Sequence, residues 1–316
     1  QVCTFTVTVN DTQAPSITCP ANIIRSNDAG TCGAIVSYPT PTATDNCSTP
    51  TVTHTSPANT ASGSTCPLGT TTVTWQAADA ASPSNVATCS FTVTVSDTQV
   101  PTLTCPGNQV RSTNVGACIA SATYTATASD NCTTSPTLSY SFSGVTTVAP
   151  WAAGTGSGST FNKGITTVTL RAVDGVGLTR TCTFRIVVSD AEAPTLVNCT
   201  SPAPVNAAAN ACSAMVTYAT PTFTDNCAPT SGTAVRISGP VSGSSISVGS
   251  NNVIFQATDA AGKTSRCTIT LTVVDNQAPV VNCPASMTVS GDGNPCTKQV
   301  FYTAPTATDN CDGALT

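Results

Sequence analysis

Apolar and hydroxyl residues alternate in a segment that occurs four times along the chain. Each copy begins with Cys, and every second residue after it is Phe, Ile, Leu or Val, separated mainly by Ser or Thr. A period of two is typical of a β-strand with one buried face. We therefore predict strands at residues 3–9, 89–95, 182–188 and 267–273.

The residues between these segments predict further short strands. After residue 10, a first strand ends at Cys19 and Pro20 follows it, a residue that interrupts a strand ladder. Residues 34–38 and 72–76 also alternate, and one or two weaker strands fit the Ser/Thr-rich stretch between them. Six to eight short strands per repeat, frequent turn signals and no helical periodicity predict an all-β sandwich.

A joint of the form Asp-x-x-x-Pro follows each alternating segment, at residues 11–15, 97–101, 190–194 and 275–279. A period of about 90 residues is typical of an array of small domains. We therefore divide the chain into a terminal strand of a preceding or neighbouring-chain domain, three whole repeats, and the first part of a fourth: residues 1–10, 11–96, 97–189, 190–274 and 275–316. The second repeat carries an insertion around Trp151.

Composition narrows the class of protein. Only 8% of the 316 residues are charged and the net charge is −5, which disfavours nucleic-acid binding. No apolar run approaches the ~20 residues of a membrane span. The 17 cysteines recur at fixed places rather than in metal-binding pairs, a pattern typical of structural disulfides in secreted proteins. We therefore expect an extracellular, secreted or cell-surface location.

Several motifs recur together: the joint, Cys-Pro, Thr-Asp-Asn-Cys, a strand that ends in Ala-x-Asp, and the closing Cys-x-Phe-Thr-Val-x-Val. This set resembles HYR (hyalin repeat) domains over essentially the whole chain, and most closely the charge-poor, Thr-rich bacterial-type arrays. The resemblance implies tandem immunoglobulin-like β-sandwich domains in an elongated array, an extracellular adhesive or surface role, and no catalysis.

The expected strand directions predict how the cysteines pair. If successive strands alternate direction, the end of the first strand brings Cys19 to Cys32. The second strand then ends where the last begins, which brings Cys47 to Cys89, because bridged α-carbons lie within ~7 Å. The same rule predicts seven pairs: Cys19–Cys32, Cys47–Cys89, Cys105–Cys118, Cys132–Cys182, Cys199–Cys212, Cys227–Cys267 and Cys283–Cys296.

Three cysteines remain outside these pairs. Cys66 stands where other repeats have Phe161 and Ile246, so we interpret it as a buried apolar thiol. Cys3 and Cys311 belong to incomplete repeats. Two interpretations stay open: the chain is a window of a longer array, or Cys3 and its strand complete the last domain of a neighbouring copy by strand donation.

Most of the acidic residues recur at three positions of the repeat: the joint, the Asp-Asn-Cys turn and the turn before the last strand. The strand directions place all three at one end of each domain, so three triplets are expected: Asp11, Asp45 and Asp79; Asp97, Asp130 and Asp174; Asp190, Asp225 and Asp259. Three carboxylates fit a structural Ca²⁺ site, since Ca²⁺ takes oxygen ligands. The alternative is that each Asp caps its own turn.

No enzyme motif stands out, and the single histidine, His54, has neither a metal cluster nor a triad around it in the sequence. The leading hypothesis is a non-catalytic extracellular rod, fibre or filament that self-associates or continues in a longer array, with no cofactor other than structural Ca²⁺. The alternatives are a cell-surface adhesin or glycan-binding module, with Trp151 in its loop, and the stalk of a larger secreted enzyme.

Overall fold

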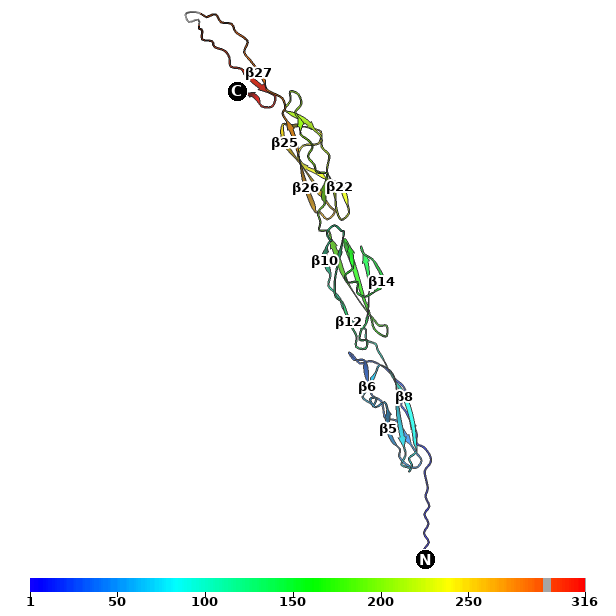
Figure 1. Cartoon of the computed structure of the whole chain (residues 1–316). Coiled ribbons are helices and arrows are strands. Elements are labelled where there is room, and N and C mark those ends of the chain that lie inside the picture. Colours follow the sequence, from blue (N-terminus) through cyan, green and yellow to red (C-terminus); the bar gives the residue numbers. More distant parts are fainter. Residues whose placement is uncertain (292–296, 316) are drawn as a thin grey trace. The chain divides into compact units, whose positions relative to one another are not determined.

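The computed structural model describes residues 1–291 and 297–315, and the side chains of residues 1–291 and 297–312. Every regular element in this part of the chain is a β-strand. The chain divides into two compact units, and Figure 1 shows the strands coloured along the sequence. One contains residues 1–110, 121–161 and 165–187, and the other contains residues 111–120, 162–164 and 188–316.

The first repeat lies in the first unit and is a sandwich of short strands. Its larger sheet has the order β2-β8-β7-β5, and two smaller sheets pair β1 with β4 and β3 with β6. The number of strands agrees with the sequence prediction. They are β1 (Ser16–Thr18), β2 (Ile23–Ser26), β3 (Gly33–Val36), β4 (Thr42–Thr44), β5 (Thr51–Ser56), β6 (Ser64–Pro67), β7 (Gly69–Ala78) and β8 (Val86–Ser96).

The alternating pattern of the last strand produces the core of this sandwich. Phe91, Val93 and Val95 on β8 are buried, while the hydroxyl residues between them lie on the other face. The buried residues pack with Ala34 and Val36 of β3 in one cluster. The hydrophobic face is thus covered by the second sheet, as a sandwich requires.

The first part of the repeat crosses from one sheet to the other. β1 runs antiparallel to β4, with Ile17 opposite Ala43. After Cys19 and Pro20 the chain moves to the larger sheet, where β2 runs parallel to β8 with Ile23 opposite Val93. This crossover places residues 19–22 beside the first half of the last strand, which decides the disulfide pairing described below.

The second repeat has the same plan with one more edge strand. Its large sheet has the order β10-β17-β16-β13-β14, and the insertion around Trp151 forms β14, which pairs with β13. Trp151 is 39% exposed and lies under the guanidinium of Arg171, 4.5 Å from the ring centre. The strands are β9 (Thr102–Thr104), β10 (Gln109–Ser112), β11 (Ile119–Ser121), β12 (Thr127–Ser129), β13 (Thr137–Gly144), β14 (Val148–Ala153), β15 (Thr160–Asn162), β16 (Gly164–Val173) and β17 (Thr179–Ser189).

The third repeat lies in the second unit. Its larger sheet has the order β19-β26-β25-β23, with the parallel pair β19 and β26 in the place of β2 and β8. The strands are β18 (Thr195–Val197), β19 (Val205–Asn206), β20 (Ser213–Val216), β21 (Thr222–Thr224), β22 (Ser231–Thr233), β23 (Val235–Ser238), β24 (Ser244–Ser247), β25 (Gly249–Thr258) and β26 (Thr264–Val274).

The two ends of the chain differ from whole repeats. Residues 275–316 contribute one small antiparallel sheet, made of β27 (Val280–Asn282), β28 (Thr306–Asp309) and β29 (Gly313–Leu315). The strand predicted at residues 3–9 does not form within this chain, where residues 1–10 have no ladder partner and are exposed. An alternating segment becomes a strand only when another strand pairs with it, and here none does.

Candidate functional site

Three disulfides each lie within one repeat and join its first segment to its last strand. Cys19 pairs with Cys89, Cys105 with Cys182, and Cys199 with Cys267. The predicted pairs Cys19–Cys32 and Cys47–Cys89, and their counterparts in the second and third repeats, are therefore wrong, whereas Cys283–Cys296 has one member outside the described residues. The reason is the crossover after Cys19, which carries this cysteine to the side of β8 instead of leaving it at the end of the domain.

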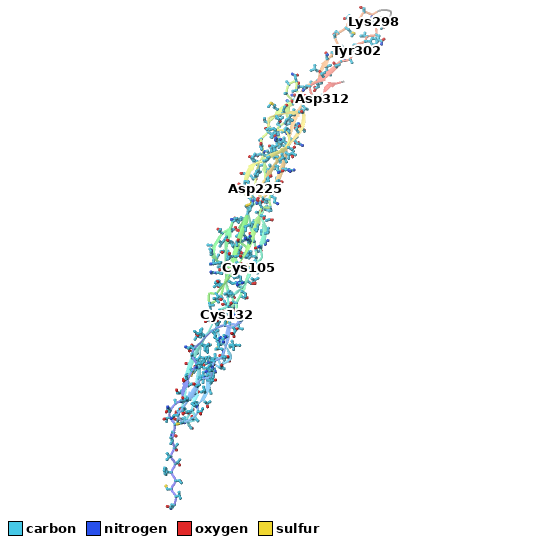
Figure 2. The ribbon with its side chains drawn as sticks, turned by 180° about the vertical axis from the view of Figure 1, so that it is seen from behind. Cys105, Cys132, Asp225, Lys298, Tyr302 and Asp312 are labelled. Carbon is cyan, nitrogen blue, oxygen red and sulfur yellow. A yellow bond between two sulfur atoms is a disulfide. The ribbon has the colours of Figure 1, made fainter. Side chains whose placement is uncertain are left out.

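Three other disulfides connect consecutive repeats. Cys32 pairs with Cys132, Cys118 with Cys227, and Cys212 with Cys311. The first of these cysteines lies in the loop after β2 or its counterpart, at the end of the domain where the chain leaves for the next repeat. The second lies in the Asp-Asn-Cys turn, at the end of the next domain where the chain enters. Figure 2 labels one cysteine of each kind in the second repeat: Cys132 lies in this turn, and Cys105 belongs to the intra-domain disulfide.

The predicted unpaired cysteines also change. Cys311 is paired, whereas Cys47 and Cys283, predicted to be bridged, are free and exposed in the part of the chain that the structure describes. Cys3 is free and exposed as predicted, and Cys296 lies outside the described residues. The pairing pattern of the complete repeats accounts for the free cysteines. Cys47 occupies the place of the inter-domain cysteines Cys132, Cys227 and Cys311, while Cys3 and Cys283 occupy places in an intra-domain pair.

Cys66 lies in the core, with 1% of its surface exposed, opposite Ala34 on the neighbouring strand. Burial raises the pKa of its thiol. Phe161 and Ile246 are buried in the other two repeats. The structure thus places Cys66 where the interpretation as an apolar core residue requires it.

A recurring polar clamp surrounds each inter-domain disulfide. The Asn of the Asp-Asn-Cys turn donates its side-chain amide to the carbonyl of the residue before the partner cysteine. Asn131 donates to Thr31 (2.7 Å), Asn226 to Ala117 (3.1 Å) and Asn310 to Ala211 (3.0 Å). This Asn therefore recurs because it contacts the preceding repeat.

The third residue of the joint completes the clamp. Gln99 accepts a hydrogen bond from the amide of Gly30 and donates to the carbonyl of Asp28, and Gln277 makes the equivalent pair with Asn210 and Ala208. At the junction between the second and third repeats, Glu192 accepts from the amide of Gly116. A Gln or Glu two residues after the joint Asp thus contacts the loop of the repeat before it.

The acidic triplets come together as the strand directions predict. In each of the three triplets, one carboxylate oxygen from every residue lies within 4.8 Å of the others. Three unit charges at this distance repel by roughly 3 kcal/mol per pair at an effective dielectric constant of about 20. An arrangement of this kind requires hydrogen-bond donors or a cation around the carboxylates.

The two oxygens of these carboxylates have different surroundings, which is clearest in the second repeat. One oxygen of each caps a turn: Asp130 Oδ1 accepts from the amides of Cys132 and Thr133, and Asp174 Oδ1 accepts from Val176 and Leu178. The other oxygen, Oδ2, is buried in both residues and has no hydrogen-bond partner among the described residues; the same holds for Asp97. Turn capping therefore accounts for Oδ1 of each carboxylate and leaves Oδ2 without a hydrogen bond from the described residues.

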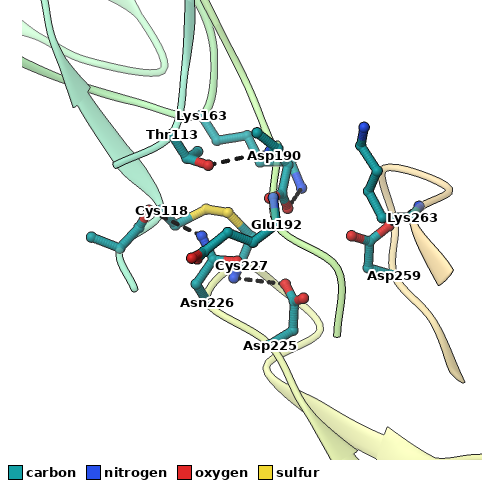
Figure 3. A network of polar contacts seen from close by, with 12 residues as sticks. Thr113, Cys118, Lys163, Asp190, Glu192, Asp225, Asn226, Cys227, Asp259 and Lys263 are labelled. Atoms are coloured by element: carbon teal, nitrogen blue, oxygen red, sulfur yellow. Dashed lines mark hydrogen bonds and ion pairs between the residues drawn. A yellow bond between two sulfur atoms is a disulfide. The ribbon is translucent and has the colours of Figure 1, made fainter. Parts of the chain in front are cut away.

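The first and third triplets have a protein donor on one of these oxygens. In the first repeat, Asn85 donates its side-chain amide to Asp79 Oδ2 at 2.8 Å. Burial acts to raise the pKa of Asp79, but the combined hydrogen bonds from Asn85, Ala81 and Ser84 outweigh it and lower the pKa. At the third triplet, the ammonium of Lys163 from the second repeat lies 3.0 Å from Asp190 Oδ2 (Figure 3).

Reasoning from the sequence missed the function of Asn131 and its counterparts and the inter-domain cysteine pairs. The available signal was the strict recurrence of Asn between the capping Asp and the Cys. His54 lies in the first repeat, where its Nε2 is 3.3 Å from the hydroxyl of Thr60 and its ring is edge-on to Trp75. It is a packed side chain with no part in the acidic triplets.

The comparisons with known proteins agree with the repeat pattern. The HYR domain profile matches residues 10–95, 96–188 and 189–273. The chain belongs to the HYR domain family. A protein named hyalin from Strongylocentrotus purpuratus is 32% identical over 98% of this chain, and hyalin from Lytechinus variegatus is 33% identical over 97%. The chain spans 25% of the first relative and 56% of the second, and both are sea urchin proteins, so a bacterial-type array has no support from them.

Solved structures of cadherin ectodomains are also similar. The protocadherin GammaB4 extracellular domain matches 84% of this HYR chain with 14% identity and a TM-score of 0.34, over 52% of its own length. Drosophila N-cadherin EC1-4 matches 84% with 12% identity and a TM-score of 0.30, over 76% of its own length. In the part of the HYR chain that the structure describes, no helix is long and apolar enough to cross a membrane.

Proposed function

We propose that this HYR chain is a load-bearing section of an extracellular structural protein that forms fibres or filaments. The observation that carries the proposal is the disulfide between consecutive repeats, which occurs with the same polar clamp at all three junctions. Disulfides are stable outside the reducing cytosol, so this architecture suits a secreted or cell-surface material.

The intra-domain disulfides give each repeat a short covalent route for tension. Cys19 and Cys89 join the beginning of the first repeat to its last strand, so a pull along the chain bypasses the strands between them. From Cys89 the route continues through the joint to Cys105, which is bridged to Cys182 in the same way. The remaining strands of each sandwich carry little of the load.

The inter-domain disulfides add a second covalent connection across each junction. The backbone passes through the joint, and the Cys32–Cys132 bond runs beside it. Together with the contacts of Gln99 and Asn131, this double connection restricts rotation of one HYR domain against the next. A material made from such repeats resists both stretching and cleavage at its joints.

Trp151 does not favour the alternative of glycan binding. Its ring is stacked on Arg171 of the same sheet, so the side chain already has a packing partner within its own repeat.

Electron microscopy of the native material tests the proposal. We expect continuous fibres that bind antibodies against residues 97–274 at regular intervals along their length. Isolated short stalks that carry a different terminal domain would contradict it and would favour the stalk of a secreted enzyme instead. A recombinant chain of the same three repeats, imaged alone, serves as the size standard.

A further inference from the structure

We propose that Asp97, Asp130 and Asp174 form a calcium-binding site at the junction between the first and second HYR domains. The three residues come from the joint, the Asp-Asn-Cys turn and the turn before the last strand, all within one compact unit. The inference does not depend on whether the protein forms fibres.

The strongest observation is that buried carboxylate oxygens lack partners. Asp97 is 9% exposed and Asp174 is 8% exposed, and the Oδ2 atoms of both, together with Asp130 Oδ2, accept no hydrogen bond from any described residue. A buried ionised group normally has a donor or a counter-charge. Because Oδ1 of each residue already caps a turn, the remaining oxygens are fixed in place for a ligand that is not part of the protein.

The donor set selects the kind of ion. One oxygen from each residue lies within 4.8 Å of the others, so a point equidistant from all three is at most about 2.8 Å from each, and small shifts bring them into the roughly 2.3–2.6 Å range of Ca²⁺. Hard carboxylate oxygens suit Ca²⁺ or Mg²⁺, and the neighbouring Cys132 is excluded as a ligand because it is bridged to Cys32. Ca²⁺ accepts irregular oxygen shells, whereas Mg²⁺ requires near-octahedral geometry at 2.0–2.1 Å, so we assign the site to Ca²⁺.

The position of Asp97 links the ion to the junction. The next residue, Thr98, donates its amide to the side chain of Asn27 in the first domain. Asp97 is thus held between a contact to the first domain and the two turns of the second. An ion on its free oxygen would fasten the joint to the second domain and reduce the freedom of the junction.

The other two junctions provide internal comparisons. At the third triplet, the ammonium of Lys163 from the second repeat binds Asp190 Oδ2 and supplies a positive charge. Lys163 stands directly before Gly164, a place taken by Leu68 before Gly69 and Val248 before Gly249. In the first repeat, the amide of Asn85 binds Asp79 Oδ2. The middle triplet alone keeps three unpartnered oxygens among the described residues, so it should bind Ca²⁺ most tightly.

The test measures Ca²⁺ binding to the oxidised 316-residue chain by isothermal titration after removal of metal with a chelator. We expect one tight site, with Mg²⁺ binding at least tenfold more weakly. Asp174→Asn should weaken this site at least tenfold. Glu192→Gln is the matched control, because it removes one carboxylate from a junction and installs the residue present at Gln99 and Gln277, and it should leave the tight site unchanged.

A second variant keeps the test decisive. Lys163→Leu removes the ammonium from Asp190 and should raise the number of tight Ca²⁺ sites from one to two. If Asp174→Asn fails to fold, Asp97→Asn should show the same loss of tight Ca²⁺ binding. A Ca²⁺-dependent rise in the melting temperature of the native chain, absent in Asp174→Asn, supports the site independently. The absence of Ca²⁺ binding to the native chain, or binding that neither Asp variant weakens, would overturn the proposal.

Discussion

The intra-domain disulfides predict that the oxidised chain can hardly be extended, even when its domains unfold. The shortest covalent route from Cys19 to Cys267 crosses three disulfides and includes the joints from 89 to 105 and from 182 to 199. The two joints together contain 33 residue steps of up to ~3.6 Å each. With the three disulfide bridges added, the whole route spans roughly 140 Å when fully extended. Without disulfides, the same ends are 248 steps apart and span roughly 890 Å.

Single-molecule force spectroscopy of the 316-residue chain measures this difference. In the oxidised protein we expect no unfolding step that releases more than a few tens of ångströms. After reduction, three steps should appear, each releasing most of the length of a repeat of about 90 residues, up to roughly 300 Å when fully extended. The same molecule pulled before and after addition of reductant is its own control.

The reasoning would be refuted by unfolding steps of 200 Å or more in the fully oxidised chain. Such steps would show that Cys19–Cys89, Cys105–Cys182 or Cys199–Cys267 does not close the load-bearing route. Serine replacements that remove Cys105–Cys182 together with Cys32–Cys132 and Cys118–Cys227 should give one large step in the oxidised state, which assigns the step to the second domain, because the inter-domain bridges would otherwise bypass most of it.

Three further predictions concern single contacts. Removing the Cys105–Cys182 bridge, which spans 77 residues, should destabilise the second HYR domain by about 4.5 kcal/mol in the chain-entropy model, measured by urea unfolding. Asn226→Ala deletes the bond to the Ala117 carbonyl and should lower the equilibrium constant for forming Cys118–Cys227 in a thiol redox buffer about fivefold, equivalent to about 1 kcal/mol, with Asn251→Ala as a surface control. The lowered pKa of Asp79 means that its hydrogen bonds stabilise the first domain above the ordinary Asp pKa, and that this stability is lost as the pH falls below about 4. Between pH 6 and pH 2 the melting temperature should therefore fall less steeply for Asn85→Ala than for the native chain. An equal decrease in both proteins would contradict the assignment.

The fold was accessible from the sequence because its strongest signal is local. Alternation such as Phe91, Val93 and Val95 marks a strand wherever a second sheet covers it, and the repeat shows where each sandwich begins. The convergence of Asp97, Asp130 and Asp174 also followed from strand direction alone, since turns at the same end of a sandwich lie close together.

The cysteine pairing was not accessible in this way. The prediction assumed that the first strand stays in one sheet, whereas the chain crosses over after Cys19 to run parallel to β8. A strand that pairs in parallel shows the same period of two as one that pairs antiparallel, and β2 is only four residues long. A bond between Cys32 and Cys132 joins two domains, so no argument confined to one sandwich could find it. The repeated Asn beside Cys132, Cys227 and Cys311 was the remaining clue.

Disulfide mapping of the unreduced protein tests the central claim, that consecutive HYR domains are joined by covalent bonds between their side chains. Digestion under non-reducing conditions, followed by mass spectrometry, identifies which cysteine-containing peptides are linked. We predict linked peptides containing Cys32 with Cys132, Cys118 with Cys227, and Cys212 with Cys311. Linked peptides that pair Cys19 with Cys32 and Cys132 with Cys182 would contradict the account.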